Sequence, residues 1–338
     1  MCSSDLWIME SSTANRRPIY TGGDLDGRVF SLSPDASWLL FTRKSKQTGQ
    51  INSLWVLPLT GDQSTSPEPV DLKVNNIIHF AEWVPNATRT IAYSTVEPST
   101  SAPGWQAKND LYLLPLNPNG SPRNPNQILD ASYRGFFAWW GLTFSFSPDG
   151  ANLAYARTDG IGLVDFTNQR LVPLLDIQYY RTGEDWAWVP GISWSPDGKA
   201  IYTVTHSALN FSGPPEESRQ FNLAAVPRAD APPIELLQGV GMFSYPSTSP
   251  WIPDTGYYIA ALEAFSSDQS DTSRYRLIVM DRDGSNRMRI FPAEGSPGLQ
   301  PQKVVWSPLD SNNSRLWIAC LYQGNLWLVN PDGTQTHQ

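Results

Sequence analysis

Four tryptophans fall in two chain segments whose composition is suited to ligand binding. Trp139 and Trp140 lie in ASYRGFFAWWG (131–141), and Trp186 and Trp188 lie in IQYYRTGEDWAWVPG (177–191). Aromatic rings of this kind stack on sugar rings or enclose the side chains of a peptide or partner protein. Packing inside the fold is the alternative interpretation for each of them.

Acidic side chains and a histidine lie close to these tryptophans in the sequence. The carboxylates would form an acidic rim, or remain solvated loop residues: Glu184, Asp185, Glu216 and Glu217. His206 opens the segment HSALNFSGPPEESRQ (206–220). A histidine beside carboxylates can act as a general acid or base, whereas a hydrogen bond that orders the loop is the alternative role.

Motifs of the common catalytic and cofactor sites are missing from the sequence. It has no Gly-x-Ser-x-Gly, no paired Cys-x-x-Cys, no His-Glu-x-x-His and no phosphate-binding glycine loop. The other histidines are His79, in a predicted first strand, and the nearly terminal His337, which does not favour a multi-histidine metal site. Asp-x-Asp-Gly at 24–27 and 281–284 places its glycine too early for a calcium loop. We therefore expect no metal, no cofactor and no assigned catalytic residue.

Charge and hydropathy exclude two further classes of partner. Charged residues make up 17% of the 338 residues and the net charge is −8, without the basic stripe that a nucleic-acid backbone requires. No apolar run approaches the roughly 18 residues of a membrane span. Residues 1–6 (MCSSDL) resemble a translated sequencing adapter, so we expect a fragment that lacks the natural N-terminus and any export signal.

The element that must position these residues is an internal repeat. An apolar strand, a Ser-Pro-Asp-Gly turn or a variant of it, and a second apolar strand recur about every 50 to 60 residues. The copies are SLSPDASWLLFTR (31–43), AEWVPNATRTIAYST (81–95), FSFSPDGANLAYAR (144–157), ISWSPDGKAIYTV (192–204), TSPWIPDTGYYIAAL (248–262) and VVWSPLDSNNSRLWIACL (304–321). Most copies continue into a third strand, as in SLWVLPLTGD (53–62). Four short antiparallel strands repeated radially form a propeller blade.

This repeat resembles that of the TolB-like, WD-repeat-like β-propeller family over nearly the whole chain. The resemblance implies an all-β propeller in an extracytoplasmic bacterial setting, either periplasm or cell surface. It does not specify the function, because such propellers serve as binding scaffolds, as peptidase-associated gates and as enzymes.

We expect one propeller domain over residues 1–338 with six recognisable units and a half unit. The approximate units are 24–73, 77–130, 141–175, 189–237, 243–292 and 302–338. Residues 6–23 match the last two strands of a unit, as in 276–292, and are predicted to be the outer strands of the closing blade. The intact protein could have six blades or seven, and we prefer seven.

Eight of the 14 tryptophans fall at strand positions of the repeat and are expected in the core: Trp7, Trp38, Trp55, Trp83, Trp194, Trp306, Trp317 and Trp327. Successive connections in a four-stranded meander alternate between the two faces of the disc. Short turns occupy one face, whereas the long insertions 96–108, 206–220 and 264–273 and the links between blades occupy the other. Variable loops on a rigid scaffold commonly carry the binding residues. The candidate ligand-binding residues are Trp105, Trp139, Trp140, Glu184, Asp185, Trp186, Trp188, His206, Glu216, Glu217, Arg219, Met242 and Tyr245.

Three functions are compatible with this pattern. The first is a non-catalytic binding or scaffold propeller that captures a peptide, protein or glycan on its long-loop face. The second is a glycan-active lyase or hydrolase that uses the loop carboxylates and His206. The third is a regulatory propeller detached from a peptidase domain. The oligomeric state is not indicated by the sequence.

Overall fold

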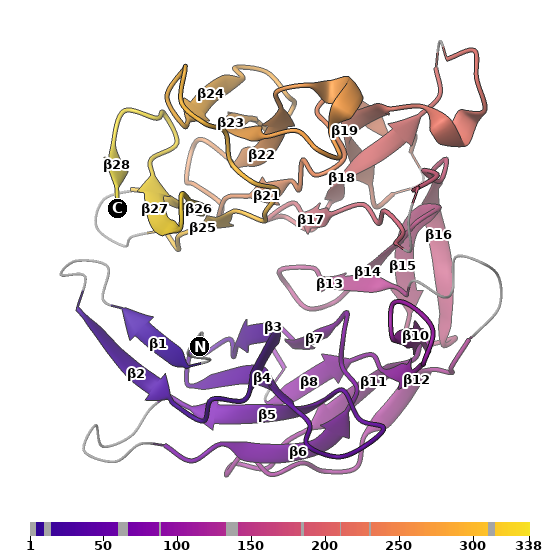
Figure 1. The fold of residues 1–338 in the computed structure, drawn as a ribbon, viewed down its shortest axis with the longest axis vertical. Coiled ribbons are helices and arrows are strands. Elements are labelled where there is room, and N and C mark those ends of the chain that lie inside the picture. The colour runs from indigo at the N-terminus through magenta and orange to yellow at the C-terminus, as the bar shows by residue number, and fades with distance from the viewer. Residues whose placement is uncertain are drawn as a thin grey trace. The chain divides into compact units, whose positions relative to one another are not determined.

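A computed structural model describes residues 5–9, 15–59, 67–87, 89–132, 141–183, 186–209, 211–229, 231–309 and 315–338. Within these ranges the chain forms six four-stranded antiparallel sheets, two two-stranded hairpins and two short 3-10 helices (Figure 1). The fold is a β-propeller, which confirms the predicted class and the six units with an N-terminal half unit. Two compact units divide the chain: residues 1–143 with 165–170, and residues 144–164 with 171–338.

The first unit contains the N-terminal hairpin, two blades and an inserted hairpin. The N-terminal hairpin pairs β1 (Leu6–Met9) with β2 (Arg16–Tyr20). Blade 1 consists of β3 (Leu25–Leu32), β4 (Trp38–Lys44), β5 (Asn52–Pro58) and β6 (Val70–Asn75). Blade 2 consists of β7 (Ala81–Trp83), β8 (Thr90–Tyr93), β11 (Leu111–Pro115) and β12 (Asn126–Leu129). The insertion expected as a long loop at 96–108 is the hairpin of β9 (Val96–Pro98) and β10 (Trp105–Ala107).

The second unit contains most of blade 3 and all of blades 4, 5 and 6. Blade 3 consists of β13 (Thr143–Phe146), β14 (Leu153–Arg157), β15 (Gly160–Asp165) and β16 (Arg170–Asp176). Blade 4 consists of β17 (Ile192–Trp194), β18 (Ala200–Ser207), β19 (Gln220–Pro227) and β20 (Ile234–Leu237). Blade 5 consists of β21 (Ser247–Thr248), β22 (Tyr258–Ala264), β23 (Tyr275–Asp281) and β24 (Met288–Phe291). Blade 6 consists of β25 (Val305–Trp306), β26 (Ile318–Tyr322), β27 (Asn325–Val329) and β28 (Thr336–His337). The 3-10 helices η2 (Pro215–Glu217) and η3 (Ser267–Gln269) lie in the long connections of blades 4 and 5.

The Ser-Pro-Asp turns hold the first two strands of a blade together through side-chain hydrogen bonds. In blade 4, the hydroxyl of the fully buried Ser195 donates to Asp197 Oδ1 at 2.6 Å and accepts the N–H of Ala200 at 3.0 Å. In blade 1, the corresponding hydrogen bond from Ser33 lowers the pKa of the Asp35 carboxyl to about 2. Serine and aspartate therefore recur in the motif because they satisfy polar groups that the turn buries.

Apolar faces of neighbouring blades pack together and form the core of each unit. Val29, Leu54 and Val56 of blade 1 pack against Trp83 and Ile91 of blade 2. At three interfaces the indole N–H of a first-strand tryptophan donates to a carbonyl in the first strand of the preceding blade. These bonds join Trp83 to Ser31 (3.2 Å), Trp194 to Ser145 (2.9 Å) and Trp306 to Ser247 (3.0 Å).

The expectation that Trp7 belongs to the core was wrong. Its side chain is 52% exposed, because β1 pairs with β2 alone among the described strands. Arg16 lies over the Trp7 ring at 5.5 Å from its centroid.

Candidate functional site

A groove of about 940 Å3 lies at the long-loop end of blades 4 and 5 in the second unit. Four connections line it: the segment after blade 3 (180–181), the β18–β19 loop with the first residue of β19 (209, 211 and 217–220), the link after blade 4 (238–239) and the β22–β23 loop (267–268). The residues that matter most for its chemistry are Tyr180, Arg181, Leu209, Phe211, Glu217 and Arg219. Two of the long insertions and two of the links between blades therefore meet at one surface.

The groove lining combines exposed apolar side chains with charges of both signs. Leu209 is 68% exposed and Phe211 is 44% exposed. Arg181 Nη1 forms an ion pair with Glu217 Oε1 at 2.8 Å, and Arg219 Nη1 donates to the main-chain carbonyl of Asp268 at 3.1 Å. An exposed ion pair contributes at most about 1 kcal/mol to stability, so these contacts chiefly orient the arginine and glutamate side chains along the groove.

Three predicted binding residues lie beneath the groove and are buried. His206 is 4% exposed and Trp188 is 2% exposed, and Met242 is likewise buried. The Trp188 indole N–H donates to the Met242 carbonyl at 2.9 Å, and its ring centroid lies 5.0 Å from that of Phe221. These residues support the groove from below.

Both ring nitrogens of His206 are directed at main-chain carbonyls. Nδ1 lies 2.8 Å from the carbonyl oxygen of Gln178, and Nε2 lies 2.6 Å from that of Ser218. The imidazole thus lies between the link after blade 3 and the β18–β19 loop, with a ring nitrogen close to a carbonyl of each. Both nitrogens are therefore directed at the main chain.

Trp186 and Tyr245 form a separate, half-buried aromatic cluster with Phe243. The ring centroids of Trp186 and Phe243 are 6.4 Å apart, and those of Phe243 and Tyr245 are 5.9 Å apart. Burial raises the pKa of the Tyr245 hydroxyl. Gly191 is required beside this cluster, because a Cβ at that position would lie 2.8 Å from Cδ1 of Tyr245.

The remaining predicted residues are distributed as follows. Glu217 and Arg219 line the groove, and the carbonyl of the neighbouring Glu216 accepts the N–H of Arg181 at 2.7 Å. Four lie outside the described residues: Trp139, Trp140, Glu184 and Asp185. Trp105 belongs to the first unit, where β10 places its ring edge-on to His79 with centroids 4.6 Å apart.

His79 precedes β7 and is not part of the strand in which it was predicted. Burial, with a smaller effect of the Arg28 charge, lowers the pKa of His79 to about 4. Its Nε2 atom has no hydrogen-bond partner among the described residues. His79 therefore favours the neutral imidazole.

Leu209, Phe211 and Tyr180 line the groove but were not singled out from the sequence. Leu209 and Phe211 lie within the otherwise mostly polar insertion 206–220. Large apolar residues are unusual in such a loop. Exposed apolar side chains among polar loop residues are a signal for binding, and that signal was available.

A cavity of about 870 Å3 also lies at the short-turn end of blades 5 and 6, which was expected to be plain. The short turns of both blades line it. Several of its polar side chains complete their own turns: Asp283 Oδ1 accepts the Ser285 N–H at 3.0 Å, and Asp332 Oδ1 accepts the Thr334 N–H at 2.9 Å. Their oxygens are thus engaged within the turns, and this cavity is the weaker candidate.

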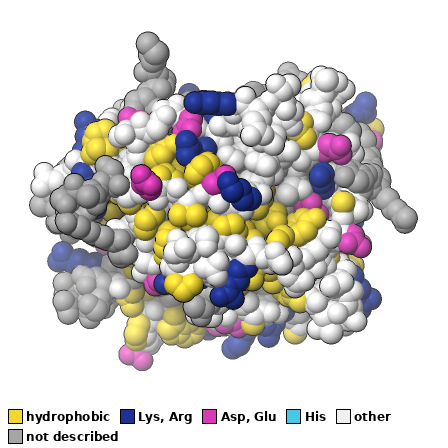
Figure 2. Space-filling view, turned by 90° about the horizontal axis from the view of Figure 1, so that it is seen from below, with side chains coloured by type: hydrophobic (Ala, Val, Ile, Leu, Met, Phe, Trp, Pro, Cys, Tyr) yellow, Lys and Arg dark blue, Asp and Glu magenta, His cyan; other side chains and the backbone are white. Residues whose placement is uncertain are grey.

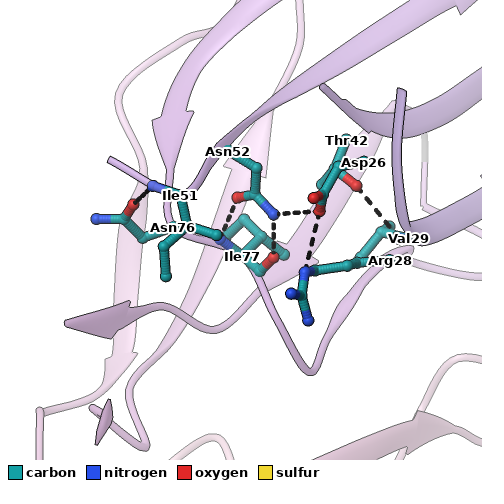
Figure 3. A network of polar contacts seen from close by, with 8 residues as sticks. All are labelled: Asp26, Arg28, Val29, Thr42, Ile51, Asn52, Asn76 and Ile77. Atoms are coloured by element: carbon teal, nitrogen blue, oxygen red, sulfur yellow. Dashed lines mark hydrogen bonds and ion pairs between the residues drawn. The ribbon is translucent and has the colours of Figure 1, made fainter. Parts of the chain in front are cut away.

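In the first unit, a polar network stabilises the long-loop end of blade 1 (Figure 3). The side-chain amide of the fully buried Asn52 donates to Asp26 Oδ2 at 2.7 Å and to the Ile77 carbonyl at 2.6 Å, while its oxygen accepts the Ile77 N–H at 2.8 Å. In blade 4, Asn222 similarly donates to Glu235 Oε2 at 2.8 Å and accepts the Gly239 N–H at 3.1 Å. Buried asparagines at the start of third strands therefore fix the links from which this end is built.

Charged side chains are dispersed on the side of the molecule shown in Figure 2. Lys, Arg, Asp and Glu are scattered around a band of apolar side chains, without a continuous basic area among the coloured residues. In the described part of the chain, no group of three or more His, Cys, Asp or Glu is arranged to hold a metal ion. No helix there is long and apolar enough to cross a membrane.

No family model and no curated protein matches the sequence. Similar solved structures include an oligogalacturonate lyase in complex with manganese, with 14% identity and a TM-score of 0.60 over 96% of this chain and 81% of that one. Prolyl endopeptidase has 11% identity and a TM-score of 0.58 over 98% of this chain and 45% of its own. A protein from Agrobacterium tumefaciens assigned as TolB has 18% identity and a TM-score of 0.48, covering 87% and 90% of the two chains. At these identities, the similarity to the lyase and to the endopeptidase shows the propeller fold alone.

Proposed function

We propose that this protein is a binding propeller that captures an extended peptide segment of a partner protein in the long-loop groove of blades 4 and 5. The observation that carries the proposal is the convergence of four connections on a groove of about 940 Å3. Variable connections on a rigid β scaffold are the usual location of binding residues.

The composition of the groove supports a peptide more than a sugar. Leu209 and Phe211 offer exposed apolar area for a side chain, and Arg181, Glu217 and Arg219 offer charges of both signs along the same surface. A sugar site would instead need a broad aromatic platform, and Tyr180 is engaged edge-on with Phe221 (centroids 5.3 Å apart) and with His206 (5.4 Å).

Catalysis through His206 is not part of the proposal. A general acid or base must reach the proton that it transfers, whereas both nitrogens of His206 are within hydrogen-bond distance of main-chain carbonyls. The contacts of His206 thus favour binding over the lyase or hydrolase alternative.

A peptide array and a glycan array, screened in parallel with the purified chain, test the proposed function. For the best peptide, Phe211→Ala and Arg219→Ala should each weaken binding about tenfold or more. Trp251→Ala is the matched control, because Trp251 is a similarly exposed aromatic residue (49%) in the β21–β22 turn at the short-turn end of the same unit. Selective glycan binding, or peptide binding lost in Trp251→Ala and kept in Phe211→Ala, would contradict the proposal.

We also propose an extracytoplasmic setting for this binding function. The support is the resemblance of the Ser-Pro-Asp-Gly repeats to those of the TolB-like family. Fractionation of the source cells with an antibody against the chain tests it, and recovery of the native protein in the cytoplasmic fraction would contradict it.

A further inference from the structure

His206 lies between two of the four connections that line the groove of blades 4 and 5. Its Nδ1 atom is 2.8 Å from the carbonyl oxygen of Gln178, just before Tyr180 in the chain, and its Nε2 atom is 2.6 Å from the carbonyl oxygen of Ser218. Tyr180 and Ser218 both line the groove. One imidazole ring therefore contacts the main chain of two groove walls.

Both contacts of His206 can be hydrogen bonds only if the ring is protonated. A carbonyl oxygen accepts a hydrogen bond and cannot donate one, whereas a neutral imidazole has one N–H donor and one bare nitrogen. The bare nitrogen would face a carbonyl oxygen at 2.6 or 2.8 Å, lone pair against lone pair. The imidazolium has two N–H donors, so it satisfies both carbonyls at once.

The packing around His206 makes a missing donor costly. The ring is 4% exposed. The aromatic rings of Phe221, Tyr180 and Trp188 surround it, with centroids at 5.0, 5.4 and 6.4 Å. A buried polar atom without a partner is destabilising, so the neutral ring weakens the contact with one of the two walls.

The connections around His206 also carry charged and titratable groups. The described ones are Tyr180, Arg181, Glu216, Glu217, Arg219, Asp268 and Asp271. The ion pairs of the described residues do not include His206. Burial raises the pKa of the Tyr180 hydroxyl, the Arg219 charge lowers it and the Asp271 charge raises it. Carboxyl groups ordinarily titrate at about pH 4, so a change between about pH 5.5 and about pH 8 isolates histidine.

Two further contacts join the same pair of connections. Arg181 Nη1 pairs with Glu217 Oε1 at 2.8 Å, and the Arg181 N–H donates to the Glu216 carbonyl at 2.7 Å. The ion pair is solvent-exposed and contributes little. Exchange of the Arg181 amide proton reports directly whether the two walls stay together.

We propose that His206 is a positioning residue of the groove, whose imidazolium holds the link after blade 3 and the β18–β19 loop together. Given the proposed function, on which this inference rests, the groove binds peptides more tightly at mildly acidic pH than at mildly alkaline pH. Loss of the proton leaves one carbonyl without its donor, and the wall that carries it separates from the ring.

The first test needs no ligand and uses hydrogen exchange of the full chain, corrected for intrinsic exchange rates. Protection of the Arg181 amide should be about tenfold higher at about pH 5.5 than at about pH 8. In His206→Gln, protection should be equal at the two pH values. His337→Gln is the matched control and should keep the pH dependence of the wild type, because His337 is an exposed histidine of the same unit outside the groove lining.

The second test screens one peptide array at both pH values. Peptides that bind the wild-type chain should bind about tenfold more tightly at the lower pH, and His206→Gln should bind them equally at both. The proposal is overturned if Arg181 exchange is independent of pH, if His206→Gln keeps the pH dependence, or if peptide affinity does not follow the exchange. An array without a binder at either pH, with pH-dependent exchange, would refute peptide capture and still support the role of His206 in holding the walls.

A measurement on the unmodified ring covers the case in which His206→Gln does not fold. The chain has three histidines, so His79→Gln and His337→Gln assign the remaining nuclear magnetic resonance signals of 15N-labelled histidine to His206. Its ring should show two N–H protons at the lower pH and one at the higher pH. The same number of N–H protons at both pH values would overturn the proposal.

Discussion

Replacing Trp188 with alanine should destabilise the protein, because this side chain supports the groove from below. The ring is 2% exposed and its N–H donates to the Met242 carbonyl at 2.9 Å. Truncating a buried tryptophan to alanine costs about 3 to 5 kcal/mol. For a chain of 338 residues, the entropy of unfolding is roughly 0.7 kcal/mol/K, so the melting temperature should fall by about 4 to 7 °C.

Thermal unfolding followed by far-ultraviolet circular dichroism measures this shift. Trp188→Phe keeps most of the apolar contact and loses only the hydrogen bond, so about 1 to 2 kcal/mol should be lost. Phe211→Ala, at an exposed groove position, is the control and should change stability by less than about 1 kcal/mol. If Trp188→Ala melts with the wild type but loses the peptide, Trp188 faces the ligand and the burial argument is refuted.

Three further predictions concern turns, close backbone approaches and pH. Ser195→Ala should lose about 1 to 3 kcal/mol in urea unfolding with unchanged peptide affinity, because the fully buried hydroxyl binds main-chain N–H groups of its turn; an affinity change without destabilisation would contradict this. Gly162→Ala should be far more destabilising than Gly198→Ala in the same measurement. A Cβ at Gly162 would lie 2.2 Å from the Val172 carbonyl oxygen, whereas a Cβ at Gly198 meets no atom within 4 Å and is disfavoured only by the φ of +66°. Equal effects of the two substitutions would contradict this reasoning. Burial lowers the pKa of His79 to about 4 in the folded state, so its stabilising contribution is fully present above its ordinary pKa of about 6.5 and is lost as the pH falls toward 4. His79→Gln should flatten the decrease in urea midpoint between pH 7 and pH 4.5, and an unchanged slope would assign that decrease to other groups.

The repeat made the fold predictable because its turn chemistry is local. Serine, proline and aspartate at fixed offsets specify the hydrogen bonds seen at Ser33 and Ser195, and these involve residues within five positions of each other. The alternating apolar strands around the turns then determine which faces pack. Six four-stranded blades follow from such short-range patterns.

The candidate site was predicted at the level of segments and less well at the level of side chains. The connections 206–220 and 177–191 do meet at the groove, as the alternation of strand connections requires. However, which side of a loop faces outward depends on contacts distant in sequence. The contact of Trp188 with Met242 spans 54 positions and that of His206 with Gln178 spans 28. The sequence therefore offered both packing inside the fold and ligand contact for these side chains, and the choice between them depends on contacts that the local pattern does not contain.

Trp7 is exposed although its strand context predicted the core, and Trp188 is buried, which was one of the two interpretations of its loop context. One physical cause accounts for both. A residue of the strand type is buried only if a neighbouring strand and sheet cover it, and β1 has such a neighbour on one side alone in the described chain. A loop residue is buried when several connections converge, as they do at the end of blades 4 and 5. An apolar residue in this fold is therefore stabilised by burial against other elements. The number of strands and connections that pack on it decides whether it belongs to the core or stays exposed and able to contact a partner.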